Sequence, residues 1–147
     1  MNNFMKTEFP AISQNESFAR LLAAGFIMEL DPTVEEMSEV KTAVSEAVTN
    51  AIIHGYRVKD GMVMLTGEIN GREVTFTVTD SGEGIENIEL ARKPLYTGAP
   101  EMERSGMGFT VMETFMDKVD VISEPGKGTT VILYKNVAAG EEGVRCG

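Results

Sequence analysis

A carboxylate and an amide lie one helical turn apart near position 50 of the chain. Glu46 and Asn50 are separated by four positions, so on a helix both side chains project from the same face. Their neighbours are largely apolar, and a buried carboxylate is costly unless it is paired or used in chemistry. The pair therefore indicates either a site that handles a proton and a ligand, or a helix flank where both side chains simply reach water.

A second candidate segment is Asp80-Ser81-Gly82-Glu83-Gly84-Ile85, which follows a stretch of strand-like alternation. Asp80 would stand at the end of that strand, above a glycine-rich turn. Glycines allow a ligand to approach the backbone closely and supply amide donors that no side chain covers. The alternative is an ordinary loop with a turn-forming aspartate.

Two further segments have Gly-x-Gly spacing. Arg104-Ser105-Gly106-Met107-Gly108-Phe109 leads directly into a helical pattern, and free amides at a helix N-terminus bind phosphate. Residues 126–130 are superficially similar to a P-loop, but Val121 occupies the position of its first glycine and a strand follows. Walker A is therefore excluded. A hairpin turn fits this segment and leaves open a ligand contact from Thr130.

Helices must position the first and third of these segments. Residues 13–16 and 33–36 both have the pattern of a capping box, in which a hydroxyl and a carboxylate cap each other's backbone amides. Apolar residues then recur at helical spacing, which predicts helices to about Leu30 and to Gly55. A further helix is predicted from Gly108 to Met116.

Strands must position the other two segments. The pattern changes to strict alternation on both sides of Asn70-Gly71, which favours a two-residue hairpin turn. A second hairpin is predicted around residues 125–128, and a short edge strand over residues 2–9. Residues 87–105 have no clean period, which is typical of a functional lid or of disorder. Together these elements predict one α/β sandwich with a mostly antiparallel sheet.

Composition excludes several classes of function. The chain has 147 residues, 13 basic and 23 acidic side chains, and a net charge of -10. An acidic surface repels nucleic-acid backbones and anionic lipid, so we expect no direct nucleic-acid or membrane partner. A single cysteine, Cys146, cannot form an intramolecular disulfide, which favours a reducing compartment. We expect a cytoplasmic, single-domain protein.

The order of the four segments is more specific than any one of them. A Glu-x3-Asn helix, Asp-x-Gly-x-Gly after a strand, an irregular stretch, Gly-x-Gly before a helix and Gly-x-Gly-Thr-Thr before a strand together resemble the four boxes of the GHKL (Bergerat-fold) ATPases and kinases. The resemblance covers about residues 33–134. The strings EAVTNAIIHGY and RSGMGFTVM are most similar to the sporulation anti-sigma-factor serine kinases. This family implies a two-layer sandwich whose mixed, mostly antiparallel sheet carries helices on one face.

The resemblance also implies roles for individual residues. Asn50 would be a ligand of the Mg²⁺ that bridges the phosphates of ATP, and Glu46 would be the general base. Asp80 would accept a hydrogen bond from the adenine amino group, and Arg104 could stabilise the transferred charge. The remaining contacts to ATP or ADP would come from Gly82, Gly84, Ile85, Thr97, Ser105, Gly106, Gly108, Phe109 and Thr130, the last of them at the adenine end.

The implied activity is transfer of a phosphoryl group from ATP to a serine of an anti-anti-sigma factor. The ATP-bound protein would also hold a sigma factor away from RNA polymerase, and it would be a homodimer. Arg20 is either a charged anchor for a partner or a solvated helix residue. The single ATP-binding domain would span residues 1–137, with a lid at about 87–107 and a disordered tail at 138–147.

Three other functions compete with this hypothesis. A nucleotide-gated binding module would need the phosphate contacts but no base, so the presence of Glu46 favours the kinase. The ATPase domain of a DNA-topology or mismatch-repair machine is disfavoured, because those proteins carry further domains. A sensor histidine kinase needs a phosphoacceptor histidine on a preceding helical domain, whereas His54 is the only histidine.

Overall fold

The computed structural model describes residues 2–56, 61–81, 108–138 and 146. Its helices are α1 (Gln14–Ile27), α2 (Val34–Tyr56) and α4 (Gly108–Phe115), with a short 3-10 helix, η1 (Met28–Leu30), before α2. Its strands are β1 (Asn2–Pro10), β2 (Met62–Asn70), β3 (Glu73–Asp80), β4 (Lys118–Glu124) and β5 (Gly128–Asn136). The predicted lid lies outside the described residues.

The five strands form one sheet in the order β1-β2-β3-β5-β4, and each described pairing is antiparallel. The β2–β3 turn contains Gly71 at φ +66°, as the Asn-Gly pair predicts. β5 inserts between β3 and β4, so the end of β3 lies beside the start of β5. The predicted fold class is confirmed, and β1 is an edge strand as expected.

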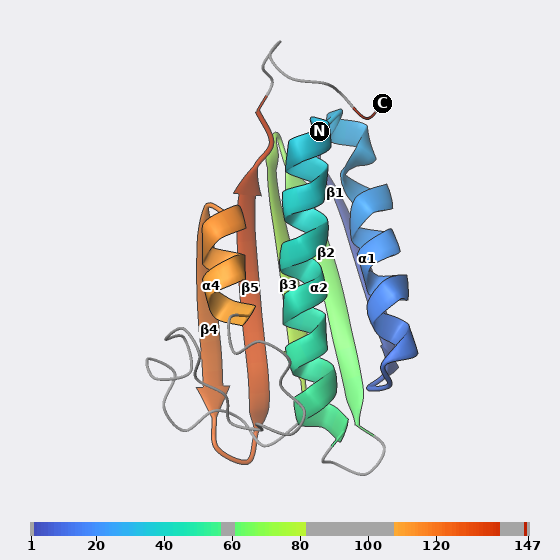
Figure 1. Ribbon diagram of the computed structural model, residues 1–147, viewed down its shortest axis with the longest axis vertical. Coiled ribbons are helices and arrows are strands. Elements are labelled where there is room, and N and C mark those ends of the chain that lie inside the picture. The colour runs from blue at the N-terminus through green and yellow to red at the C-terminus, as the bar shows by residue number, and fades with distance from the viewer. Residues whose placement is uncertain (1, 57–60, 82–107, 139–145, 147) are drawn as a thin grey trace.

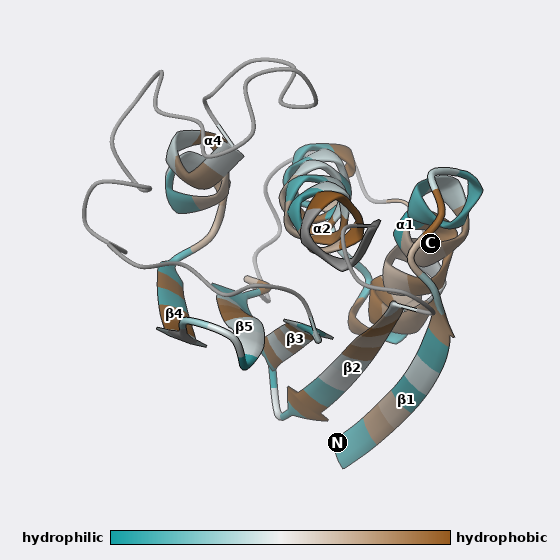
Figure 2. Cartoon of the chain, turned by 90° about the horizontal axis from the view of Figure 1, so that it is seen from below, coloured by the Kyte–Doolittle hydropathy of each residue, from teal (hydrophilic) through white to brown (hydrophobic). Residues whose placement is uncertain are grey.

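The helices cover one face of this sheet. Figure 2 shows α4, α2 and α1 side by side in one layer, with the strands in the other. α2 lies along the middle of the sheet (Figure 1), and its apolar stripe meets the alternate, inward-facing residues of the strands. Fully buried side chains at this contact include Val40, Val44, Val48, Leu65, Phe76 and Leu133. Each contributes about 1.5–3 kcal/mol relative to exposure, which fixes α2 on the sheet.

α2 is the longest of the described helices, with 23 residues, and its two ends differ in character. Its first turn carries acidic Glu35 and Glu36, while the helix packs on the core from Val40 to Ile52. Among the described residues, no helix is both long enough and apolar enough to cross a membrane.

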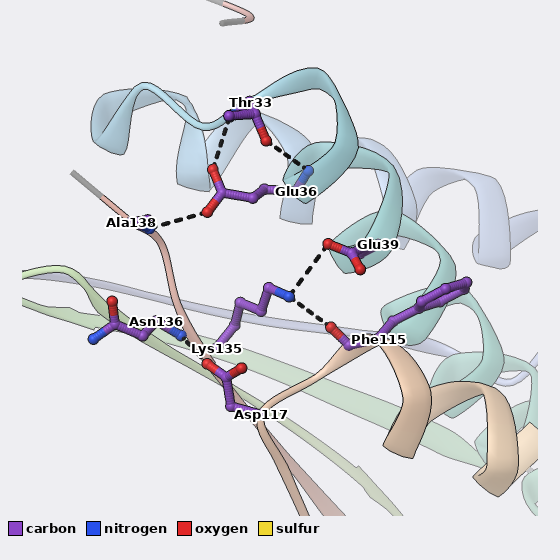
Figure 3. A network of polar contacts seen from close by, with 8 residues as sticks. All are labelled: Thr33, Glu36, Glu39, Phe115, Asp117, Lys135, Asn136 and Ala138. Atoms are coloured by element: carbon purple, nitrogen blue, oxygen red, sulfur yellow. Dashed lines mark hydrogen bonds and ion pairs between the residues drawn. The ribbon is translucent and has the colours of Figure 1, made fainter. Parts of the chain in front are cut away.

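The two predicted capping boxes have different outcomes. The Thr33 amide donates to Glu36 Oε1 at 2.9 Å and the Glu36 amide donates to Thr33 Oγ1 at 3.0 Å, so the second box is confirmed (Figure 3). The first prediction is wrong, because Ser13 has helical dihedrals and makes no side-chain cap bond. Glu16 instead accepts a hydrogen bond from Ser45 of α2.

Thr33→Ala should therefore destabilise the fold by about 1 kcal/mol, because it leaves an amide of the first turn without its side-chain acceptor. Ser13→Ala is the matched control and should change the free energy of unfolding far less. Urea titration monitored by circular dichroism gives both values. Equal losses in the two variants would contradict the assignment of the cap.

The segment after β5 is described at two places. The Ala138 amide donates to Glu36 Oε2 at 2.9 Å, and the Cys146 amide donates to the Pro32 carbonyl at 2.9 Å. Both contacts fall at the N-terminal end of α2. The prediction of a disordered tail concerns residues that otherwise lie outside the described part of the chain.

Candidate functional site

The first group of candidate residues forms where α2 meets the start of α4. Glu46 and Asn50 lie on α2, and both are partly buried. A Cβ atom placed on Gly108 would lie 3.2 Å from Asn50 Nδ2 and 3.3 Å from Glu46 Oε2. The structure therefore brings Gly108 close to Asn50 and Glu46, which precede it by 58 and 62 positions in the sequence.

Their chemistry suits an anionic ligand held with a cation. The first amides of an α-helix find no acceptor within the helix, and the helix dipole favours negative charge at this end. α4 begins at Gly108, so these amides start beside Asn50 and Glu46. Amide and carboxylate oxygens are ligands that Mg²⁺ prefers, usually together with water and phosphate oxygens. The residues present therefore fit a magnesium–phosphate group.

The second group forms where the end of β3 meets the start of β5. Asp80 is only 5% exposed, although it is an aspartate at the end of a strand. Its direct partner across the β3–β5 ladder is Thr129, which is 3% exposed. Directly opposite residues place their side chains on the same face of a sheet. A buried carboxylate and a buried hydroxyl thus lie together on the helix-covered face.

Gly128 makes this approach possible. It has φ +88°, and a Cβ atom placed on it would overlap the carbonyl oxygen of Asp80. Ser123 of the neighbouring strand donates to the Gly128 carbonyl at 3.1 Å, and its hydroxyl lies 2.8 Å from Thr129 Oγ1. The start of β5 is therefore fixed on two sides. The backbone of Gly128 lies against the Asp80 carbonyl, and the Ser123 hydroxyl of β4 contacts Gly128 and Thr129.

The register places Thr130 away from Asp80. Thr130 pairs with Thr79, and their hydroxyls lie 3.3 Å apart. Successive side chains of a strand point to opposite faces, so Thr130 lies on the uncovered face, away from Asp80. Thr129, not Thr130, therefore lies beside Asp80, and a ligand contact from Thr130 stays a prediction. The Gly-x-Gly-Thr-Thr string at the start of the strand indicated that a threonine lies near the ligand. The alternation of side chains did not decide whether Thr129 or Thr130 faces the helices.

Both groups lie at one end of the molecule. α2 runs toward this end, and the following strand β2 begins there, with Val63 directly opposite Asp80. Figure 1 shows the C-terminal half of α2, the start of α4, the end of β3 and the start of β5 at this end. The four segments therefore border one region on the helix-covered side of the sheet.

The other candidates are distributed as follows. Phe109 is the second residue of α4 and is 8% exposed, packed in the core. Arg20 lies on α1, where its guanidinium is 3.8 Å from Glu16 and its side chain is 43% exposed. α1 lies on the far side of α2 from α4 (Figure 2), so Arg20 is remote from the two groups. Seven predicted residues lie outside the described part of the chain: Gly82, Gly84, Ile85, Thr97, Arg104, Ser105 and Gly106.

Comparison with known sequences is consistent with this geometry. Residues 10–135 match the family described as the histidine kinase-like ATPase domain. An anti-sigma F factor of Clostridium kluyveri is 60% identical over 134 residues, which cover 91% of this chain and 94% of the relative. An anti-sigma F factor of Clostridium acetobutylicum is 58% identical over 142 residues, covering 97% of this chain and 99% of the relative.

Solved structures show the same fold at low sequence identity. The RsbU and RsbW domains of a Mycobacterium tuberculosis protein match with a TM-score of 0.65 and 17% identity over 92% of this chain, which spans 32% of that protein's chain. The catalytic domain of the histidine kinase ThkA matches with a TM-score of 0.59 and 17% identity, covering 90% of this chain and 96% of the domain.

Proposed function

Because the chain belongs to the family of histidine kinase-like ATPase domains, among the anti-sigma F factors, we propose that it is a serine protein kinase and a sigma-factor inhibitor. Its substrate would be ATP, and the acceptor would be a serine of an anti-anti-sigma factor. The observation that carries the proposal is the meeting of Glu46, Asn50 and Gly108 at the start of α4.

The two groups of residues would bind different parts of the nucleotide, one the adenine and the other the phosphates. Asp80, with Thr129 beside it, would accept a hydrogen bond from the adenine amino group, a contact that guanine cannot make. The amides of Gly108 and Phe109 would donate to phosphate oxygens. Further contacts stay predictions of the sequence: Gly82, Gly84, Ile85, Thr97, Ser105 and Gly106 to the nucleotide, and Arg104 to the transferred charge.

Asn50 is the residue we propose as a Mg²⁺ ligand, through its side-chain oxygen. When bound, the ion would neutralise charge that develops on the phosphates during transfer. Gly108 permits the close approach, because a Cβ atom at this position would lie 3.2 Å from Asn50 Nδ2 and 3.3 Å from Glu46 Oε2, and both side chains would have to shift slightly to accept it.

Glu46 would act on the protein substrate. Its carboxylate would accept the proton of the serine hydroxyl while the serine oxygen forms a bond to the γ-phosphorus. The bond from that phosphorus to the β–γ bridging oxygen breaks, and ADP leaves with the bonding electrons. Glu46 stands one helical turn before Asn50, so one rigid helix would hold both the proton acceptor and the proposed metal ligand.

Sigma-factor binding is proposed from the relatives' names. The identity to anti-sigma F factors supports a sigma factor as partner. Arg20 is sufficiently exposed to take part in a protein interface. The homodimer and the role of Arg20 stay predictions.

The kinase proposal is tested by incubating the protein with γ-labelled ATP, Mg²⁺ and a candidate anti-anti-sigma protein. We expect label on a serine of that protein. The matched control replaces the acceptor serine by alanine. Nucleotide binding without label on any serine would instead favour the nucleotide-gated binding module.

Asp80→Asn should weaken ADP binding by about tenfold or more, because hydrogen bonds to a charged group contribute about 1.5–3 kcal/mol. Asp120→Asn makes the same chemical change on the uncovered side of β4, beside Lys118, and should leave the affinity unchanged. Calorimetric titration with ADP measures both variants after urea titration has shown that they are folded. Unchanged ADP affinity in Asp80→Asn would contradict the adenine role.

A further inference from the structure

A lysine is almost enclosed between the sheet and the helices, far from the candidate site. Lys135 lies on β5 on the same face as buried Leu133, and its side chain is only 11% exposed. Its ammonium donates to the carbonyl oxygen of Phe115 at 2.7 Å and to Glu39 Oε1 at 3.4 Å (Figure 3). One side chain thus links β5 to the last residue of α4 and to α2.

The neighbouring residues strengthen this link. The Asp117 amide donates to the Tyr134 carbonyl at 2.8 Å, and the Asn136 amide donates to Asp117 Oδ2 at 2.6 Å. The chain that leaves α4 is therefore bound to β5 on both sides of Lys135. A cation at a helix C-terminus also interacts favourably with the helix dipole. We call Lys135, Glu39, the Phe115 carbonyl and Asp117 the C-terminal clamp of α4.

The clamp and the candidate site hold opposite ends of the same helix. At the clamp, Phe115 is linked through Lys135 to Glu39; at the site, a Cβ atom placed on Gly108 would lie 3.3 Å from Glu46 Oε2 and 3.2 Å from Asn50 Nδ2. Glu46 lies seven positions after Glu39 on α2, and Phe115 lies seven positions after Gly108 on α4, which is about 10 Å along each helix. α2 and α4 therefore run antiparallel, and the clamp and the site are about the same distance apart on each helix.

We propose that Lys135 is a positioning residue that sets the place of Gly108 and its amides against Asn50 and Glu46. The inference rests on the proposed nucleotide site, and extends it to a group that touches neither nucleotide nor acceptor. α4 is short and rigid, so a shift of its C-terminal end relative to α2 is passed on to its first residue. Small displacements matter at such a site, because a 1 Å misplacement can lower a reaction rate by about a hundredfold.

The test compares two lysines on adjacent strands. Lys135→Met keeps the length of the side chain and removes the ammonium. Lys118→Met is the matched control, because Lys118 is 64% exposed and contacts Asp120 and the ring of Tyr134. Lys135→Arg restores a charged donor. Each variant is titrated with MgADP by calorimetry and assayed for serine phosphorylation at saturating ATP, after urea titration has established the folded fraction.

We expect Lys135→Met to weaken MgADP binding and to lower the saturating transfer rate, each by about tenfold, in protein that is fully folded. Lys118→Met should match the unmodified protein, and Lys135→Arg should recover most of the loss. A purely structural role would lower the stability alone. Lys135→Met with unchanged MgADP affinity and unchanged transfer rate would overturn the proposal.

Other outcomes separate this inference from the proposed function. If the unmodified protein binds MgADP but labels no serine, the kinase proposal fails, and the MgADP affinities of the lysine variants still decide the role of Lys135. If Lys135→Met does not fold, Glu39→Gln replaces it, with exposed Glu35→Gln as control. Glu39→Gln should then weaken MgADP binding, and an affinity equal to that of Glu35→Gln would overturn the inference.

Discussion

Glu46→Gln should remove most of the phosphoryl transfer to serine while MgATP still binds. The amide has nearly the same shape as the carboxylate, so the contact with Gly108 is preserved, but it cannot accept the proton of the attacking hydroxyl. General base catalysis contributes about 10²–10⁴-fold, and we expect a loss in this range. Single-turnover transfer from labelled ATP measures the rate, and calorimetry measures the affinity.

The control for this variant lies on the same helix. Glu35→Gln makes the same change at an exposed residue of the first turn of α2, and the transfer rate should not change. Equal transfer rates for Glu46→Gln and the unmodified protein would rule out Glu46 as the base. A loss of MgATP affinity with an unchanged saturating rate would make Glu46 a nucleotide-binding residue instead.

Gly128→Ala should produce the largest loss of stability among these substitutions. A non-glycine residue at φ +88° is strained by about 1–3 kcal/mol. The added Cβ would also overlap the Asp80 carbonyl, and overpacking of this kind costs about a further 1–3 kcal/mol. We expect a total loss of about 2–6 kcal/mol, together with weaker ADP binding in the folded fraction, because β5 must move away from Asp80.

Comparison with Gly126→Ala separates the steric overlap at Gly128 from the backbone strain. Gly126 has φ +79°, close to that of Gly128, but a Cβ atom placed on it meets nothing within 4 Å. Its substitution should cost only the backbone strain and should not alter ADP affinity. Urea titration of the two variants measures the difference. Equal losses would mean that the start of β5 does not press against Asp80.

Much of the fold was predictable because its causes are local. Asn70-Gly71 specifies a hairpin, and Thr33 with Glu36 specifies a helix start, since each pattern acts within a few residues. The alternating residues of β2 and β3 predicted a sheet with one buried face, and the structure has it. Glu46 and Asn50 share a helix face for the same local reason, so the helical period alone predicted that their side chains lie together.

Three features needed the tertiary structure because they depend on residues distant in the chain. Strand register, which pairs Asp80 with Thr129, decided that Thr130 faces away from the site. Packing of α4 on α2 decided that Gly108 meets Glu46 and Asn50, and the enclosure of Lys135 between β5 and two helices has no counterpart in a local pattern.

The sequence by itself determined the elements, the class of fold and the residue types available for chemistry. Each of these follows from dihedral preferences and periodic burial within one segment. The tertiary structure alone decided which of those residues meet, because contacts between segments depend on how whole elements pack. That packing is set by the summed burial of the apolar core, a property that no single motif contains.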